Sequence, residues 1–178
     1  DCDATALRAA RAARTASPSI PVGYTFKTPP YPHQRAANER MMYSVGYGLF
    51  CDPGTGKSKC LIDDTCIAVG LGEIEATAVV CPNSIKTNWE EEIAIHSPLP
   101  TAIFIYDPVR KKAAQAFIDT PMPGRVKWFI IGVESLSSGD GAAFLLKFVK
   151  AQATCLDVDE SSRIKTWNSS RTKALLAI

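Results

Sequence analysis

The sequence predicts an α/β domain in which a parallel β-sheet is sandwiched between helices. Apolar runs alternate with helix-like stretches along the chain, an order typical of successive β-α-β units. Most of these runs are apolar at nearly every position, as expected for strands covered on both faces. The length of 178 residues and the hydrophobic content of 46% suit one such domain with a substantial core.

Residues 1–23 are expected to form an Ala/Arg-rich helix and a linker, and residues 24–178 the domain itself. Asp3 is a suitable N-cap for a helix over 3–16. Arginines spaced at helical intervals would form a basic stripe on it, namely Arg8, Arg11 and Arg14. A solvated helix face is the favoured interpretation of this stripe, and an arm that contacts phosphates is the alternative.

The apolar runs predict the strands of the sheet. They are expected at Gly48–Asp52, Ala76–Cys81, Ala102–Tyr106, Val126–Gly132, Thr154–Asp159 and Ala174–Ile178. Helices are expected around them, at 33–45, 57–70, 84–95, 109–119 and 140–152. Right-handed crossovers then bring the loops at the carboxyl ends of the strands to one edge of the sheet, where ligands bind in such folds.

Bulk charge does not identify a partner, because the formal net charge is only +2. The six cysteines include no Cys-x-x-Cys pair, and most lie in apolar runs, namely Cys51, Cys66, Cys81 and Cys155. We therefore expect buried, reduced thiols, no zinc site, and an intracellular, reducing compartment. Because no run approaches the ~20 apolar residues that a membrane span needs, no membrane association is expected.

The strongest motif is a glycine-rich loop between a predicted strand and a predicted helix, Cys51-Asp52-Pro53-Gly54-Thr55-Gly56-Lys57-Ser58. Its glycines allow the backbone N–H groups to converge on one concavity at the helix N-terminus, which suits the phosphates of ATP. Lys57 would lie between the β- and γ-phosphates, and the Ser58 hydroxyl would bind Mg²⁺. Cys51 stands where such loops usually have their first glycine.

Two carboxylates end a later strand, Asp159 and Glu160. We expect Asp159 to hold Mg²⁺ through its waters and Glu160 to act as the general base that accepts a proton from the attacking water. Asp157 lies on the same side of the strand as Asp159 because side chains alternate. It either assists the site or is simply hydrogen-bonded.

With both motifs, the chain from Tyr31 to Ile178 resembles the first RecA-like lobe of superfamily-2 helicases of the DEAD/DEAH type, especially the Swi/Snf-like branch. Tyr31-Pro32-His33-Gln34-Arg35 resembles the adenine-reading element, with Gln34 as the reader. The segment 79–93 resembles the motif that contacts the nucleic-acid backbone, through Asn83, Ser84 and Lys86. Trp89 in that segment is expected in the core. The segment 130–136, with Ser135, resembles a further motif near the nucleic acid, and Arg163 to Asn168 resembles the Swi/Snf-like continuation.

The resemblance implies a P-loop ATPase that uses ATP and Mg²⁺ and moves along nucleic acid, with DNA favoured over RNA. It also implies a second RecA-like lobe carrying catalytic arginines, so this lobe alone should bind nucleotide weakly and hydrolyse it poorly. Ser162 replaces the histidine that often follows the acidic pair in the family. The alternatives are a phosphotransferase acting on a small acceptor and a non-catalytic nucleotide-binding module.

Overall fold

The computed structural model of this chain describes residues 20–44, 46–137, 140–160 and 168–178. The predicted helix over 3–16, with its arginine stripe, lies outside these residues, as does most of the predicted Swi/Snf-like continuation. The described elements follow in the order α2 (Pro32–Met41), α3 (Lys57–Gly70), β1 (Ala76–Cys81), η1 (Asn83–Ile85), α4 (Lys86–His96), β2 (Thr101–Ile105), α5 (Lys111–Asp119), β3 (Val126–Gly132), η2 (Val133–Leu136), α6 (Gly141–Ala151), β4 (Thr154–Val158) and α7 (Ser170–Leu176).

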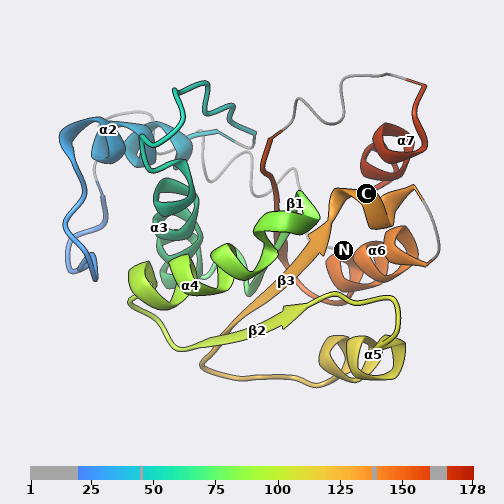
Figure 1. Cartoon of the computed structure of the whole chain (residues 1–178). Helices are drawn as coiled ribbons and strands as arrows, with labels where there is room; N and C mark the ends of the chain where they lie inside the picture. The colour runs from blue at the N-terminus through green and yellow to red at the C-terminus, as the bar shows by residue number, and fades with distance from the viewer. Residues whose placement is uncertain (1–19, 45, 138–139, 161–167) are drawn as a thin grey trace.

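A four-stranded sheet in the order β2-β3-β1-β4 forms the centre of the fold. All three neighbouring pairs are parallel, which confirms the predicted α/β architecture. Because the strands are parallel, the loops that follow β1, β3 and β4 emerge at the same edge of the sheet (Figure 1). The predictions for β1, β3 and α3 match the structure at both ends, and the other predicted helices and the predicted β2 and β4 match within a few residues.

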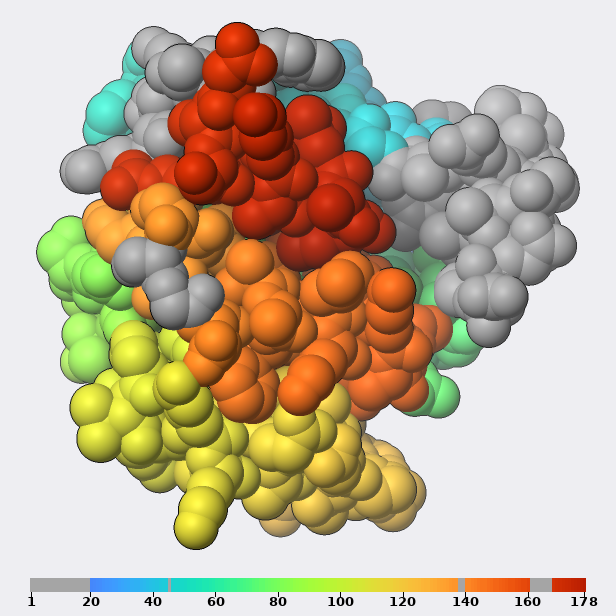
Figure 2. All heavy atoms as spheres, turned by 90° about the vertical axis from the view of Figure 1, so that its right-hand side faces the viewer, coloured from blue at the N-terminus to red at the C-terminus, as the bar shows by residue number. Residues whose placement is uncertain are grey.

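Helices cover both faces of the sheet, and alternation along β1 divides its side chains between two cores. Ala78 and Val80 pack with α5, α6 and α7, whereas Val79 and Cys81 pack with α3 and α4. Figure 1 shows the two groups of helices on opposite sides of the strands, and Figure 2 shows α5, α6 and α7 stacked over their face. The sandwich of helices around a parallel sheet is therefore confirmed.

The strand predicted at Gly48–Asp52 is wrong, since these residues form neither strand nor helix and are mostly exposed. Gly48 lowers the strand propensity of this segment, and Gly46 that of the residues just before it. The Lys57 ammonium also takes two of its backbone acceptors, donating to the carbonyl oxygens of Cys51 at 3.0 Å and Asp52 at 2.9 Å. Within the described residues, β4 consequently pairs only with β1.

The strand predicted at Ala174–Ile178 is also wrong, because most of it belongs to α7. The Ser169 side chain caps this helix by accepting a hydrogen bond from the Thr172 backbone N–H at 3.2 Å. Alanine and leucine, which dominate the segment after the cap, favour helix over strand, and it has no β-branched residue between Lys173 and Ile178. The cap and the composition together favour the helix.

The free thiols follow the packing of their elements. Cys60, Cys66 and Cys81 are buried, as expected for small apolar side chains. Cys51 is exposed, contrary to the sequence prediction, because the strand predicted to bury it does not form. No helix in the described ranges is long and apolar enough to cross a bilayer.

Candidate nucleotide-binding site

The glycine-rich loop adopts a backbone that only glycine accommodates easily. Gly54 and Gly56 have φ values of 80° and 78°, in the left-handed region. Gly56 is the N-cap of α3, so the loop leads directly into the positive end of the helix dipole. A β-carbon at Gly56 would also collide with the Gln34 side-chain amide. These constraints shape a loop suited to an anion at a helix N-terminus.

Lys57 is held by its own loop. Its ammonium donates to the Cys51 and Asp52 carbonyl oxygens, and the Thr55 hydroxyl donates to the Asp52 carbonyl oxygen at 2.8 Å. These two carbonyl oxygens hold the ammonium at the loop, and an ammonium has three N–H donors, so it can also donate to a phosphate. Ser58 lies in the first turn of α3 and is partly exposed, within reach of solvent.

The loop lysine and the carboxylates after β4 meet at one cavity of about 460 Å³. Lys57, Asp157, Asp159 and Glu160 all line this cavity, and residues 46–50 form another part of its wall. These groups are separated by about a hundred residues in sequence, and the parallel sheet brings them together because β4 and the loop share its carboxyl edge.

Asp159 is held at both its backbone and its side chain. Its backbone N–H donates to the Val80 carbonyl oxygen at 2.8 Å, which extends the β1–β4 ladder by one residue. Its carboxylate Oδ2 accepts a hydrogen bond from the Trp89 indole Nε1 at 3.0 Å. Glu160 follows with a φ of 55°, the one positive φ outside glycine in the described residues. Such backbone strain is concentrated at functional sites.

Of three comparisons with known proteins, the one with solved structures finds a similar architecture. No protein-family model matches the sequence, and no curated protein matches it. Among solved structures, the chain is similar to a Sulfolobus solfataricus SWI2/SNF2 ATPase core in complex with dsDNA, with a TM-score of 0.51 and 17% sequence identity. The similarity covers 88% of this chain but only 37% of that chain. The two chains share a parallel α/β fold, consistent with the RecA-like fold.

Asp157 is a buried carboxylate that lines the same cavity as Lys57. Only 8% of the residue is exposed, and its Oδ2 has no hydrogen-bond partner within the described residues. Its Oδ1 accepts a weak bond from the Cys155 thiol at 3.7 Å. Burial, reinforced by the nearby charge of Asp64, raises the pKa of Asp157 to about 7. The side chain therefore lies in the site as a neutral acid up to about neutral pH.

The protonation of Asp157 predicts how the stability of this chain depends on pH when no divalent metal is added. Between about pH 4 and pH 7, the folded state holds a proton on Asp157 that the unfolded chain has lost, so the free energy of unfolding should fall as pH rises. The decrease is at most about 4 kcal/mol over this range. Denaturant unfolding at several pH values measures it. Asp157→Asn should remove the decrease, whereas Asp119→Asn, at an exposed position on α5, should retain it; an unchanged profile in Asp157→Asn would contradict this assignment.

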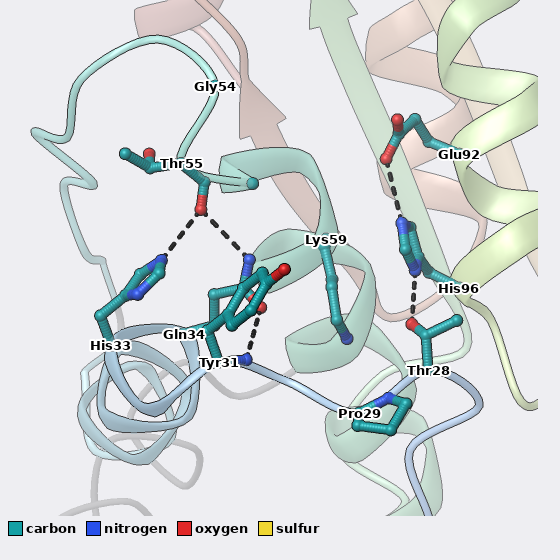
Figure 3. A pocket seen from close by; sticks show the side chains of 11 residues that line it. Thr28, Pro29, Tyr31, His33, Gln34, Gly54, Thr55, Lys59, Glu92 and His96 are labelled. Atoms are coloured by element: carbon teal, nitrogen blue, oxygen red, sulfur yellow. Dashed lines mark hydrogen bonds and ion pairs between the residues drawn. The ribbon is translucent and has the colours of Figure 1, made fainter.

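A second cavity, of about 360 Å³, opens beside the loop, between α2 and α4 (Figure 3). Gln34 lines it and is only 4% exposed. The Gln34 Oε1 accepts from the Tyr31 backbone N–H at 2.9 Å, and its Nε2 donates to the Thr55 carbonyl oxygen at 3.1 Å. Both bonds fix the orientation of the amide. Each amide end retains one further donor or acceptor for a ligand.

The opposite wall of this cavity is charged. The Lys59 ammonium is buried and forms an ion pair with the fully buried Asp63 carboxylate at 2.6 Å. A hydrogen bond of 2.5 Å joins His96 Nδ1 to the Thr28 hydroxyl. On the other side of the ring, His96 Nε2 lies 3.3 Å from the Glu92 carboxylate. Figure 3 shows Gln34 and His96 at opposite sides of the view, with Lys59 between them. A ligand here would meet polar groups on both sides.

If this cavity receives the base of ATP, Gln34→Ala should reduce the preference for ATP over GTP. One lost hydrogen bond to a buried base corresponds to about a tenfold change in the ratio of the two dissociation constants. Competition against a fluorescent nucleotide measures that ratio. Gln115→Ala, on the distant α5, is the matched control. An unchanged ratio in Gln34→Ala would exclude Gln34 as the reader.

The residues expected to meet nucleic acid lie at the carboxyl ends of β1 and β3. The Asn83 backbone N–H donates to the Glu134 carboxylate at 3.1 Å, so η1 and η2 are tied together. Ser84 is exposed, but the Lys86 ammonium donates to the Tyr106 carbonyl oxygen at 3.2 Å, and Ser135 is only 8% exposed. Asn83 and Ser84 are therefore the more accessible of these candidates.

Two contacts at the site were missed by the sequence interpretation. Trp89 is in the core as expected, but its indole also binds the Asp159 carboxylate. His33 Nε2 lies 3.1 Å from the Thr55 carbonyl oxygen and thus shares with Gln34 the contact to the loop. The position of His33 beside Gln34 was the available signal for the second contact. No local pattern signals the first, because Trp89 and Asp159 are 70 residues apart.

Proposed function

We propose that this chain is the ATP-binding lobe of a nucleic-acid-dependent ATPase of the helicase or translocase type. One observation carries the proposal: Lys57 of the glycine-rich loop lines the same cavity as Asp159 and Glu160. The lysine of a phosphate-binding loop and a pair of carboxylates are parts that ATP hydrolysis requires, and here they line one cavity, while Gly54, Thr55 and Gly56 line the neighbouring one. The RecA-like fold supports the same function by analogy.

The groups at this cavity, together with Ser58 next to Lys57 in the sequence, fit a Mg²⁺–triphosphate ligand. The Ser58 hydroxyl and the Asp159 carboxylate are hard oxygen ligands of the kind that Mg²⁺ prefers, directly or through water. Bound Mg²⁺ would neutralise charge on the phosphate oxygens. The Lys57 ammonium and the backbone N–H groups of residues 54–58 would hold the β- and γ-phosphates. Glu160 would accept the proton of the attacking water, and Gln34 would contact the adenine edge from the second cavity.

The nucleic-acid partner is proposed from the position of the strand ends. Asn83 and Ser84 lie at the same carboxyl edge as the proposed ATP cavity, and their exposed polar side chains are suitable donors to a phosphate. The neighbouring solved structure is described as a complex with dsDNA, so duplex DNA is the partner we propose. A second RecA-like lobe would complete the ATP site with arginines. Without it, hydrolysis should be slower by roughly 10³- to 10⁵-fold.

ATP turnover by the protein that contains this lobe, with and without duplex DNA, tests the proposal. We expect hydrolysis to water that DNA stimulates and that requires Mg²⁺. RNA in place of DNA is a parallel arm that identifies the nucleic acid. Transfer of the γ-phosphate to a small acceptor would indicate a phosphotransferase instead. Nucleotide binding without turnover under every condition would indicate a non-catalytic module, and either result would overturn the proposal.

A further inference from the structure

The indole of Trp89 connects α4 to the carboxylate that is proposed to hold Mg²⁺. Trp89 is 2% exposed and packs in the core between the sheet, α3 and α4, together with Cys81 and Ile93. Its Nε1, the only polar atom of the side chain, donates to Asp159 Oδ2 at 3.0 Å. The bond therefore extends from a rigid, buried ring to a side chain that lines the cavity.

The Trp89 and Asp159 side chains meet because the register of the sheet places Asp159 on the same face as Trp89. Asp157 is in register with Val79, and Val79 packs in the α3–α4 core, so Asp157 and Asp159 both point toward the α3–α4 face. Trp89 lies on α4 at that face. The Asp159 backbone is held by Val80 and one carboxylate oxygen by Trp89. With Oδ2 engaged, the carboxylate cannot rotate freely, and its other oxygen, Oδ1, is left to contact a ligand.

We propose that Trp89 is a positioning residue for the Mg²⁺ site, acting through Asp159; this inference rests on the function proposed above. Its N–H orients the carboxylate so that Oδ1 meets the metal or a metal-bound water. Hydrogen bonds of this kind to metal-binding carboxylates typically contribute 10- to 100-fold in metal affinity or activity. A tryptophan that only filled the core would have no such effect.

Trp128 offers a matched control for this inference. It lies on β3 in the same core and is completely buried, but its Nε1 has no hydrogen-bond partner within the described residues. Trp89→Phe and Trp128→Phe therefore remove comparable buried ring area. Only the first removes a bond to the Asp159 carboxylate. If both variants lose stability, the loss is due to packing. If the Mg²⁺ dependence of nucleotide binding changes in Trp89→Phe but not in Trp128→Phe, the change is due to the hydrogen bond.

The experiment measures binding of a fluorescent ATP analogue to this chain in Mg²⁺ and in EDTA. In the parent chain, the ratio of the two dissociation constants gives the Mg²⁺ dependence of binding. Trp89→Phe should decrease this ratio about tenfold or more, and Trp128→Phe should leave it unchanged. In an Asp159→Asn background, Trp89→Phe should cause no further decrease, because the oriented carboxylate is already gone.

A second measurement does not depend on whether Trp89→Phe folds. In ¹⁵N spectra of the parent chain, adding the analogue with Mg²⁺ should shift the Trp89 indole resonance more than that of Trp128. Asp159→Asn should shift the Trp89 resonance alone. If the parent chain shows no Mg²⁺-dependent binding, both the proposed function and this inference fail. If it binds with Mg²⁺ dependence that Trp89→Phe retains, or if the Trp89 resonance does not respond, only this inference is overturned.

Discussion

Lys57→Ala is expected to weaken binding of Mg²⁺–ATP to this lobe by roughly 100-fold or more. Two charge-assisted hydrogen bonds to phosphate oxygens would be lost, and each is worth about 1.5 kcal/mol or more. The Lys57 ammonium already lies at the loop, where it donates to two carbonyl oxygens. Calorimetric or fluorescence titration with a non-hydrolysable ATP analogue measures the change.

Lys112→Ala is the control for this prediction, because Lys112 is exposed on α5, far from the loop. It should bind the analogue as the parent chain does. Lys57→Arg keeps the positive charge but not the compact ammonium, so it should restore only part of the affinity. Thermal unfolding separates lost affinity from lost folding. Retention of parent-like affinity in a folded Lys57→Ala variant would remove the loop from the nucleotide site.

Glu160→Gln is expected to reduce the turnover number for ATP by about 10²- to 10⁴-fold, the usual contribution of a general base. Glutamine has nearly the same shape but cannot accept the proton of the attacking water. Binding of Mg²⁺–ATP should change little, because Glu160 is assigned to the proton and Asp159 to the metal. DNA-stimulated ATP hydrolysis by the protein that contains this lobe, together with nucleotide binding, separates the two effects.

Glu91→Gln, at an exposed position on α4, provides the comparison and should hydrolyse ATP at the parent rate. Asp159→Asn should differ from Glu160→Gln by losing the Mg²⁺ dependence of binding as well as turnover. The backbone of Glu160 is in the left-handed region, which glutamate and glutamine tolerate equally. Backbone strain therefore cannot explain a difference in turnover between Glu160→Gln and the parent protein. Parent-like turnover in Glu160→Gln would assign the base to another residue.

Local sequence determined most of the architecture. The continuous apolar runs at Ala76–Cys81 and Val126–Gly132 predicted buried parallel strands, and both are buried at every position. The glycines at 54 and 56 predicted a phosphate-binding loop before a helix, and the positive φ values and the start of α3 at Lys57 agree with that conformation. The pattern of apolar residues and the positions of glycines are properties of short segments, so they can be recognised without a tertiary structure.

The tertiary structure alone decided how distant groups meet. It brought Lys57 and the carboxylates of 157, 159 and 160 to one cavity, paired the Trp89 indole with Asp159, and oriented Gln34 against Thr55. It also left Gly48–Asp52 outside the sheet and made the segment before Ile178 a helix. These outcomes depend on strand order, on competition for backbone acceptors and on a single helix cap, and such contacts across long sequence separations leave no local periodicity to detect.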